Sequence, residues 1–365
     1  PMYSFKPSEE QQMLIDALKR YAMDDLRAAA RDAEEEGHLP VDLVEKGWEL
    51  GYLQASIPED YDGFGERSAV TGALAVEELA YGDLAGALAV MTPGLFATPI
   101  LLAGSEAQKK AYIPPVIEME WKPFTAALME QKFDFDPNDL ATTAAIDGDS
   151  VVINGEKSYV PYADGAEAML VYANLAGTTQ GFIVPAGTEG VVVGERQKLL
   201  GLNALPFYTV RFANVSVPLE NRLGGSGGHD FAPILAASNV ALAAMAIGVS
   251  NAALDYAVEY AKDRDVFGMK VAQKQAIAFM IAEMGTAIEA IRLLVWEAAW
   301  MIDGGNPEAN KQAYLALSGA MDTAMMVTDR AVQILGGHGY IREHPVEMWM
   351  RSGRGFATFN GLAIV

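Results

Sequence analysis

The sequence predicts an α+β multidomain protein with an N-terminal helical domain, a small antiparallel β-domain and a C-terminal bundle of the four-helix type. Two observations lead to this order. Segments rich in alanine, leucine and glutamate fill both ends of the chain, whereas short β-branched and aromatic runs fill its middle. The 365 residues also suffice for two or three packed units. We therefore place the domains at 1–118, 119–222 and 223–365.

The first helical part opens with a start signal. Ser8 and Gln11 have the spacing of a capping box, in which each side chain bonds the backbone of the other residue. Further along, the run from Leu84 to Ser105 carries no charge but contains Pro93 and Pro99. We expect both prolines to break it, so that it is not one continuous helix.

The middle part is predicted to form strands. The runs Val151–Ile153, Gly181–Val184 and Thr209–Phe212 are rich in β-branched and aromatic residues. Residues typical of turns separate such runs, as Asn154 and Gly155 do after the first of them. This pattern favours a small antiparallel sheet.

Long helices are predicted again after the glycine-rich linker at 224–228. Apolar residues recur there at helical spacing, at Ile277, Met280, Ile281, Met284, Ile288, Ile291 and Val295. We assign Trp296 and Trp300 of the same segment to the core. The stretch Phe231–Leu254 has no charged residue and is long enough to cross a bilayer, but its alanine-rich, weakly hydrophobic composition favours a buried bundle helix over a membrane span.

Composition restricts the partners and the chemistry. Lys and Arg number 26 against 48 Asp and Glu, a net charge of −22, which disfavours nucleic acid and anionic lipid as partners. The chain has no cysteine, which excludes disulfides and thiolate zinc sites and fits the reducing cytoplasm, where we expect the protein. The start of the chain lacks the pattern of a signal peptide. The four histidines show no ligand spacing, so we predict no metal site.

Six short strings run through the chain in a recognisable order. They are Pro58–Gly65 (PEDYDGFG), Asn154–Lys157 (NGEK), Val215–Pro218 (VSVP), Arg264–Gly268 (RDVFG), Gln275, and Gln333–Tyr340 (QILGGHGY). In sequence and order they resemble the successive signatures of the FAD-dependent acyl-CoA dehydrogenase family. The resemblance extends over nearly the whole chain.

The resemblance implies a cofactor and a reaction. Members of this family hold FAD between the β-domain and the bundle of one subunit and the bundle of a neighbour. They remove two hydrogens from an acyl-CoA thioester: a glutamate takes the Cα proton while a hydride passes from Cβ to the flavin. We therefore expect FAD as cofactor and an acyl-CoA as substrate.

The glutamate of the family is absent from both positions at which it occurs. The family's Glu-Gly-Thr string corresponds to Asn360-Gly361-Leu362, and the alternative position on the preceding long helix corresponds to Ser238. An amide or a hydroxyl does not accept a proton as a carboxylate does at neutral pH. The identity of a catalytic residue is therefore unknown.

The β-domain half of the implied FAD site has changed. The family's Thr-Glu-Pro is Met129–Gln131 here, and its Gly-Ser-Asp is replaced by the acidic segment Phe133–Asp139. The tryptophan that stacks on the flavin corresponds to Tyr159, and Pro161 follows where a hydroxyl residue is common. Loss of small and hydroxyl residues, with added negative charge, is unfavourable beside an anionic cofactor.

The bundle half of the implied site is retained. Six residues match those through which family members reach a neighbour's FAD: Arg264, Phe267, Gln275, Gln333, Gly336 and Gly337. The arginine would contact the pyrophosphate, and the glycines would allow close approach of the backbone.

The bundle half of the implied FAD site is retained and the β-domain half is lost, and this combination favours one function over two alternatives. The favoured reading is a subunit without the glutamate in a hetero-oligomeric α2β2 acyl-CoA dehydrogenase. The alternatives are a self-sufficient homotetrameric FAD enzyme with an atypical base, and a relative resembling flavin-dependent monooxygenases. Electron-transfer flavoprotein is an expected partner, and the sequence leaves the acyl group open.

Overall fold

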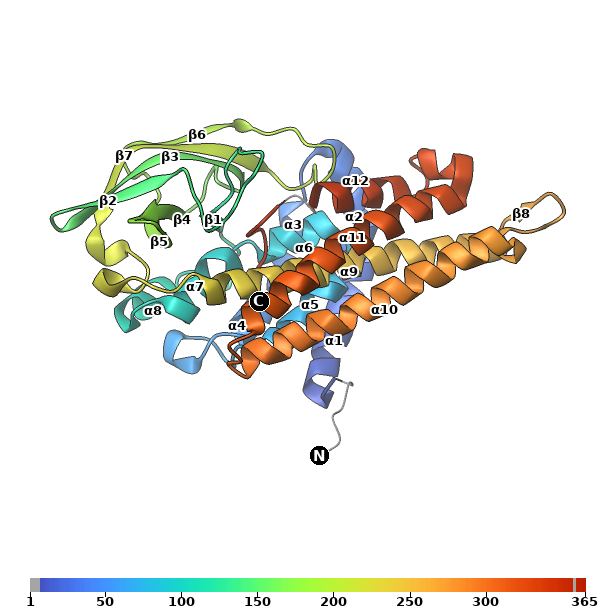
Figure 1. The fold of residues 1–365 in the computed structure, drawn as a ribbon, viewed down its shortest axis with the longest axis horizontal. Helices are drawn as coiled ribbons and strands as arrows, with labels where there is room; N and C mark the ends of the chain where they lie inside the picture. Colours follow the sequence, from blue (N-terminus) through green and yellow to red (C-terminus); the bar gives the residue numbers. More distant parts are fainter. Residues whose placement is uncertain (1–6, 357–358) are drawn as a thin grey trace.

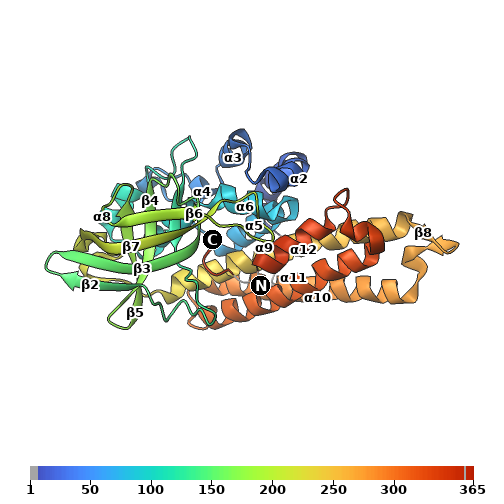
Figure 2. The same ribbon diagram turned by 90° about the horizontal axis from the view of Figure 1, so that it is seen from above.

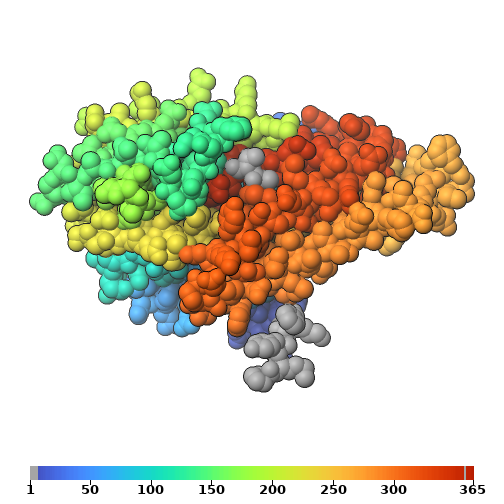
Figure 3. Space-filling view, in the orientation of Figure 1, coloured from blue at the N-terminus to red at the C-terminus, as the bar shows by residue number. Residues whose placement is uncertain are grey.

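The computed structural model describes residues 7–356 and 359–365. Helices occupy the chain as far as Tyr112, strands follow from Phe124 to Pro218, and long helices begin at Ala232 (Figures 1 and 2). This order confirms the predicted fold class. In Figure 3 the green β-domain lies directly above the yellow segment with which the C-terminal bundle begins.

From residue 7 onward, the N-terminal part contains eight α-helices. They are α1 (Glu9–Tyr21), α2 (Arg27–Glu36), α3 (Val41–Trp48), α4 (Tyr52–Ala55), α5 (Ala69–Gly82), α6 (Leu84–Met91), α7 (Gly94–Ala103) and α8 (Glu106–Tyr112). A π-helical turn, η1 (Ala22–Leu26), joins α1 to α2, and a 3₁₀ turn, η2 (Glu59–Tyr61), follows α4.

Two local predictions for these helices can be compared with the structure. The capping box at α1 is confirmed: the Gln11 N–H donates to Ser8 Oγ (3.2 Å) and the Ser8 N–H donates to Gln11 Oε1 (2.9 Å). The break near Pro93 is also confirmed, because α6 and α7 meet there at 52°. The predicted second break is wrong. Pro99 lies inside α7, at a position the helix tolerates, and does not end it.

The middle part is one seven-stranded sheet. Its strands are β1 (Phe124–Ala127), β2 (Thr143–Asp147), β3 (Ser150–Pro161), β4 (Ala168–Leu175), β5 (Thr178–Pro185), β6 (Val191–Arg196) and β7 (Phe207–Pro218). The order is β1-β4-β2-β3-β7-β6, with β5 also paired to β4. The other pairs are antiparallel as predicted, but β4 pairs in parallel with β1 and, at one position, with β2, so the sheet is mixed. β1 reaches β4 through the β2–β3 hairpin and not through a tight turn, which allows both strands to run the same way.

The Asn154-Gly155 pair does not form a turn. It lies inside β3, where the pairing with β7 shifts register between Ile153 and Gly155. Gly155 has φ +147°, and a Cβ there would lie 2.6 Å from Thr142 Oγ1. A glycine is therefore required by a bulge and a close approach, which the sequence alone did not distinguish from a turn.

The bundle consists of α9 (Ala232–Asp263), α10 (Gln275–Asp303), α11 (Ala309–Leu335) and α12 (Val346–Phe356). Short 3₁₀ turns precede α9, at η3 (Leu219–Asn221) and η4 (Gly225–Gly227), and others lie at η5 (Val271–Gln273) and η6 (Gly336–Tyr340). A two-stranded hairpin, β8 (Asp265–Val266) and β9 (Met269–Lys270), joins α9 to α10 at the end far from the β-domain (Figure 1).

Burial in the bundle follows the predicted pattern with one exception. α9 is long and apolar enough to cross a membrane by length and composition, but 83% of its most apolar window is buried inside the molecule. On α10, Met284, Ile288 and Val295 are buried. Trp296 is half-buried, whereas Trp300 is 59% exposed, so its assignment to the core of this chain is wrong. Its helical spacing places it on the outer face of α10.

Candidate functional site

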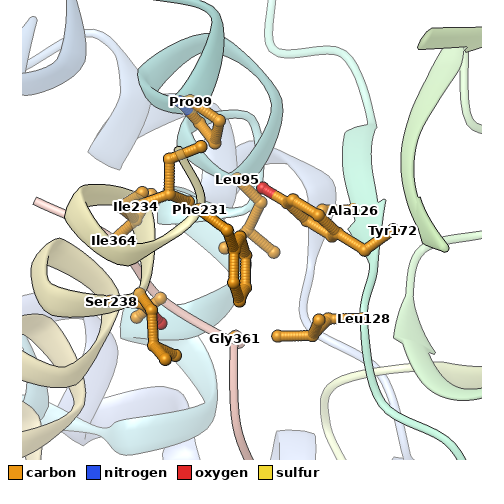
Figure 4. Close-up of a pocket in the computed structure, with 12 residues that line it drawn as sticks. Leu95, Pro99, Ala126, Leu128, Tyr172, Phe231, Ile234, Ser238, Gly361 and Ile364 are labelled. Carbon is orange, nitrogen blue, oxygen red and sulfur yellow. The ribbon is translucent and has the colours of Figure 1, made fainter. Parts of the chain in front are cut away.

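A small apolar cavity lies where the β-domain meets the bundle (Figure 4). Its walls come from α7, β1, β4 and the first two turns of α9, and from the C-terminal segment 361–364. It encloses about 20 Å³. A cavity needs roughly 10–15 Å³ to hold one water molecule, so this space is about one water in size.

One of the two positions that correspond to the family's glutamate lines this cavity, and the other directly precedes a residue that lines it. Ser238 lines it from α9, and Gly361, which follows Asn360, lines it from the C-terminal segment (Figure 4). Ser238 Oγ is buried and has no hydrogen-bond partner among the described residues. The Asn360 N–H donates to Met129 Sδ at 3.1 Å. Asn360 is therefore one residue away from the lining to which Ser238 belongs, and neither position carries a base.

The described lining of the cavity holds no carboxylate or imidazole. Its ionisable group is the phenol of Tyr172, and burial raises the pKa of that phenol well above its ordinary value. The group stays protonated at neutral pH and cannot take a Cα proton.

Gly361 fixes the path of the C-terminal segment. Its φ is +73°, and a Cβ there would lie 2.6 Å from Leu128 Cδ2. A side chain at this position would collide with the end of β1 or force the segment away. The glycine thus keeps the Asn360 position against the β-domain.

The aromatic ring expected to stack on a flavin is covered by another ring. Phe359 is buried, and its ring centroid lies 4.8 Å from that of Tyr159 in an edge-on arrangement. Phe359 also stacks on Phe207, with centroids 5.5 Å apart and planes at 15°. These are direct ring contacts. The ring of Tyr159 is therefore already in contact with an aromatic side chain of this chain.

Tyr159 itself is held in an unusual backbone conformation. Its φ is +57°, and its N–H donates to Gln197 Oε1 at 2.8 Å. A non-glycine residue in this region is strained, and such strain is often found at binding sites. Tyr159 thus keeps a backbone conformation that is typical of binding sites, although its ring contacts Phe359.

The carboxylate within the Met129–Gln131 string has a structural role. Glu130 pairs with buried Lys157 at 2.8 Å and accepts the N–H groups of Ala141 (2.7 Å) and Thr142 (2.8 Å). Burial lowers the pKa of Lys157 to about 8 despite the opposing effect of Glu130. Burial alone would raise the pKa of Glu130, but Lys157 and Thr142 outweigh it and the pKa lies below its ordinary value. Sequence reasoning missed this pair.

The acidic segment that replaces Gly-Ser-Asp is exposed. Phe133 is fully accessible, and Lys132 Nζ lies 3.9 Å from Asp134 and 3.7 Å from Asp139. Asp136 accepts the Asn138 N–H at 2.8 Å. One lysine cannot neutralise three aspartates, so this loop would repel a pyrophosphate.

The first group of retained residues projects from the far end of the bundle. Arg264 caps the C-terminus of α9 and is exposed, and Gln275 is the exposed first residue of α10. Phe267, in the β8–β9 turn, is 94% exposed and has φ +55°. Lys274 Nζ lies 5.6 Å from the centre of its ring. A strained, exposed phenylalanine on a protruding hairpin is suited to contact with another molecule.

The second group lies at the end of α11. Gln333, Gly336 and Gly337 are exposed, and Gln333 and Gly336 line a groove of about 330 Å³ together with Tyr340 and Arg354. No atom lies within 4 Å of the place that a Cβ would take at either glycine. The backbone here is open to close approach by a ligand.

A pair of histidines joins the two groups, which sequence reasoning did not foresee. His338 donates to or accepts from Tyr260 of α9 at 2.9 Å, and its ring stacks on His344 with centroids 5.2 Å apart. His344 in turn bonds Tyr256 Oη at 2.7 Å. Tyr260 is one turn from Arg264, so both groups lie at the same end of the bundle. Tyr159, in contrast, lies with the β-domain.

These histidines do not form a metal centre with further ligands. Within residues 7–356 and 359–365 no group of three or more His, Cys, Asp or Glu side chains could hold a metal ion.

Family models match the chain in three consecutive regions. The N-terminal, middle and C-terminal domains of acyl-CoA dehydrogenases match residues 8–120, 125–215 and 226–363. The chain belongs to the acyl-CoA dehydrogenase family. The members of this family are flavoprotein oxidoreductases that act on the CH–CH bond of acyl-CoA thioesters.

Individual acyl-CoA dehydrogenases and related proteins resemble the chain over almost its full length. Caffeyl-CoA reductase-Etf complex subunit CarC of Acetobacterium woodii is 33% identical over 98% of this chain and 96% of its own. The mitochondrial short-chain specific acyl-CoA dehydrogenase of Bos taurus is 33% identical, with 97% and 87% covered. The structure of butyryl-CoA dehydrogenase from Megasphaera elsdenii superposes with a TM-score of 0.89 at 31% identity, covering 99% of this chain and 96% of that one.

Proposed function

We propose that this chain is the subunit without the glutamate in a hetero-oligomeric acyl-CoA dehydrogenase. In this proposal it places the end of its bundle against FAD held mainly by a homologous catalytic subunit, in an α2β2 assembly. The assembly introduces an α,β double bond into an acyl-CoA thioester, and the partner supplies the base.

The contact between Phe359 and Tyr159 carries the proposal. We infer that Phe359 occupies the side of Tyr159 on which a flavin would stack, because the ring centroids are only 4.8 Å apart. The acidic loop from Phe133 to Asp139 and the missing base at Ser238 and Asn360 support the same reading, because the loop disfavours an anionic cofactor and the two positions offer no proton acceptor.

The open residues at the bundle end fit the complementary role. The guanidinium of Arg264 can make a charge-assisted contact to a pyrophosphate, and the bare backbone at Gly336 and Gly337 can approach it closely. Gln275 and Gln333 offer exposed amides for hydrogen bonds. When bound there and by the partner, FAD supplies the acceptor for the hydride that leaves Cβ.

We further propose electron-transfer flavoprotein as the redox partner of the assembly. The similarity to CarC, a subunit of a caffeyl-CoA reductase-Etf complex, supports this partner.

Co-expression with a homologous chain that carries Glu-Gly-Thr tests the proposal. Native mass gives the subunit composition, and the flavin absorbance gives the number of FAD molecules in each assembly. We expect an α2β2 complex with one FAD per αβ pair and no FAD-loaded homo-oligomer of this chain. Two FAD molecules per pair would show that this chain holds its own cofactor, and a loaded homotetramer would favour the self-sufficient alternative.

A further inference from the structure

Two aromatic side chains meet across the cavity at Ser238 and Gly361. Phe231 precedes α9, and Tyr172 stands on β4, so one ring comes from the bundle and the other from the β-domain (Figure 4). Their centroids are 5.2 Å apart, with planes inclined by 58°. Phe231 is 7% exposed and Tyr172 is 3% exposed. The two rings therefore span the junction between the domains as one buried contact.

The position of Phe231 is fixed by the start of α9. Its carbonyl accepts the first helical hydrogen bond from the Leu235 N–H at 3.0 Å, and Asp230 Oδ1 accepts the Ala232 N–H at 3.0 Å. Phe231 is seven residues before Ser238, so the two side chains lie on the same helical face two turns apart. The ring thus occupies the continuation of the wall that Ser238 begins.

The position of Tyr172 is fixed by the sheet. It pairs across β4 and β5 with Gly181, where a Cβ would lie 3.4 Å from Tyr172 Cε1. That distance is ordinary contact, but the same Cβ would lie only 3.2 Å from Leu170 Cδ1, so a larger residue would crowd this side of β4. The glycine leaves the phenol undisturbed on the face toward the cavity.

We propose that Phe231 and Tyr172 are the residues that determine acyl specificity in this chain, by closing its acyl cavity to thioesters of butyryl length or longer. The cavity they leave is about 20 Å³, the size of one water molecule, and four acyl carbons need several times that space. This inference rests on the proposed function, because it takes the junction at Ser238 and Gly361 as the place of the acyl group. It adds that this subunit is closed to substrate as well as lacking a base.

Isothermal titration of the full chain with butyryl-CoA and with CoA alone tests this closure. In the wild type the two ligands should bind with equal affinity, because the butyryl group finds no space. In Phe231→Ala butyryl-CoA should bind roughly 10- to 100-fold more tightly than CoA, as expected when about three CH₂ groups become buried. Tyr172→Leu should give a smaller preference in the same direction.

Phe96→Ala is the matched control, because Phe96 is also fully buried and packs on an aromatic ring, Phe124 at 5.3 Å, but does not line the cavity. It should show no butyryl preference. If Phe231→Ala fails to fold, Phe231→Leu takes its place, with an expected preference of several-fold. A wild type that already prefers butyryl-CoA tenfold, folded Phe231 variants without any preference, or an equal gain in Phe96→Ala would overturn the inference. Flavin absorbance of the same samples reports separately on the proposed function.

Discussion

The rings of Phe359 and Tyr159 meet edge-on with their centroids 4.8 Å apart, and Phe359 also stacks on Phe207. Phe359 directly precedes Asn360, the residue that stands in place of the glutamate. One short C-terminal segment therefore contains both the ring that packs against Tyr159 and the position from which the base is missing. The two are parts of one local structure.

Arg264 should contribute to FAD binding in the complex and not to the fold of this chain. Arg264→Ala, measured with the partner, should weaken FAD affinity roughly ten- to hundredfold, since a charge-assisted contact is worth about 1.5–3 kcal/mol. Arg264→Lys should restore part of it, because a point charge replaces a planar fork. Arg20→Ala, at another exposed helix end, is the control. Unchanged FAD affinity with a lowered melting temperature would make Arg264 an ordinary structural residue.

Restoring the carboxylate should not restore the reaction. We expect Asn360→Glu, purified alone, to show no dehydrogenation of butyryl-CoA above background with an artificial electron acceptor. The cavity beside this position still measures only about 20 Å³, and Phe359 still contacts Tyr159. A clear rate from this single variant would contradict the account, because it would mean that the small cavity admits the acyl group and that Phe359 moves away from Tyr159 in solution.

The buried ion pair of the β-domain predicts an asymmetric mutational response. Glu130→Gln should lower the free energy of unfolding by about 3–5 kcal/mol, because it leaves the ammonium of Lys157 buried without a counter-charge. The double variant Glu130→Gln/Lys157→Met should recover part of that loss. Urea unfolding of the three proteins gives the values. A loss below 1 kcal/mol for the single variant would mean that water reaches Lys157.

Asp83 should make stability depend on pH. It is buried at the N-terminus of α6, and burial raises its pKa to about 6 although the Gly86 N–H, at 2.7 Å, opposes the shift. Its ordinary pKa is about 3.9, so between about pH 4 and 6 the folded chain binds more protons than the unfolded chain. The free energy of unfolding should fall by at most about 3 kcal/mol as pH rises through this window.

The variant Asp83→Asn keeps a capping oxygen and removes the ionisation. Urea unfolding at pH 4.5 and 7 should show that the wild type loses roughly 1–3 kcal/mol relative to this variant over that interval. Parallel behaviour of the two proteins would rule out a raised pKa at Asp83. Asp83→Ala, which also loses the cap, should be less stable than Asp83→Asn at both pH values.

Local sequence signals predicted the helices and strands of this fold well. Helix caps, the spacing of apolar residues and local composition each depend on residues that are close together in the sequence. The Ser8–Gln11 box and the break before α7 are examples. Pairing between distant segments left no such signal. The parallel partner of β1 and the contact of His338 with His344 depend on the path of the whole chain.

For the candidate site, too, the sequence predicted some features and not others. The sequence identified Ser238 and Asn360 as empty base positions, and the structure places Ser238 in the wall of a cavity that Gly361, the residue after Asn360, also lines. Nothing local in the sequence indicated that Phe359 would cover Tyr159 or that Phe231 would meet Tyr172. Those contacts join residues 200 and 59 positions apart in the chain. They decide whether cofactor and substrate fit.

The flavin content of this chain produced without a partner tests the central claim most directly. The ratio of absorbance near the flavin bands to that at 280 nm, followed by titration with FAD, gives the number of FAD molecules per chain. Because Phe359 packs against Tyr159 and the loop Phe133–Asp139 adds negative charge to the β-domain, we predict a colourless protein that takes up less than one FAD in ten chains. A yellow homo-oligomer with one FAD per chain would contradict the account.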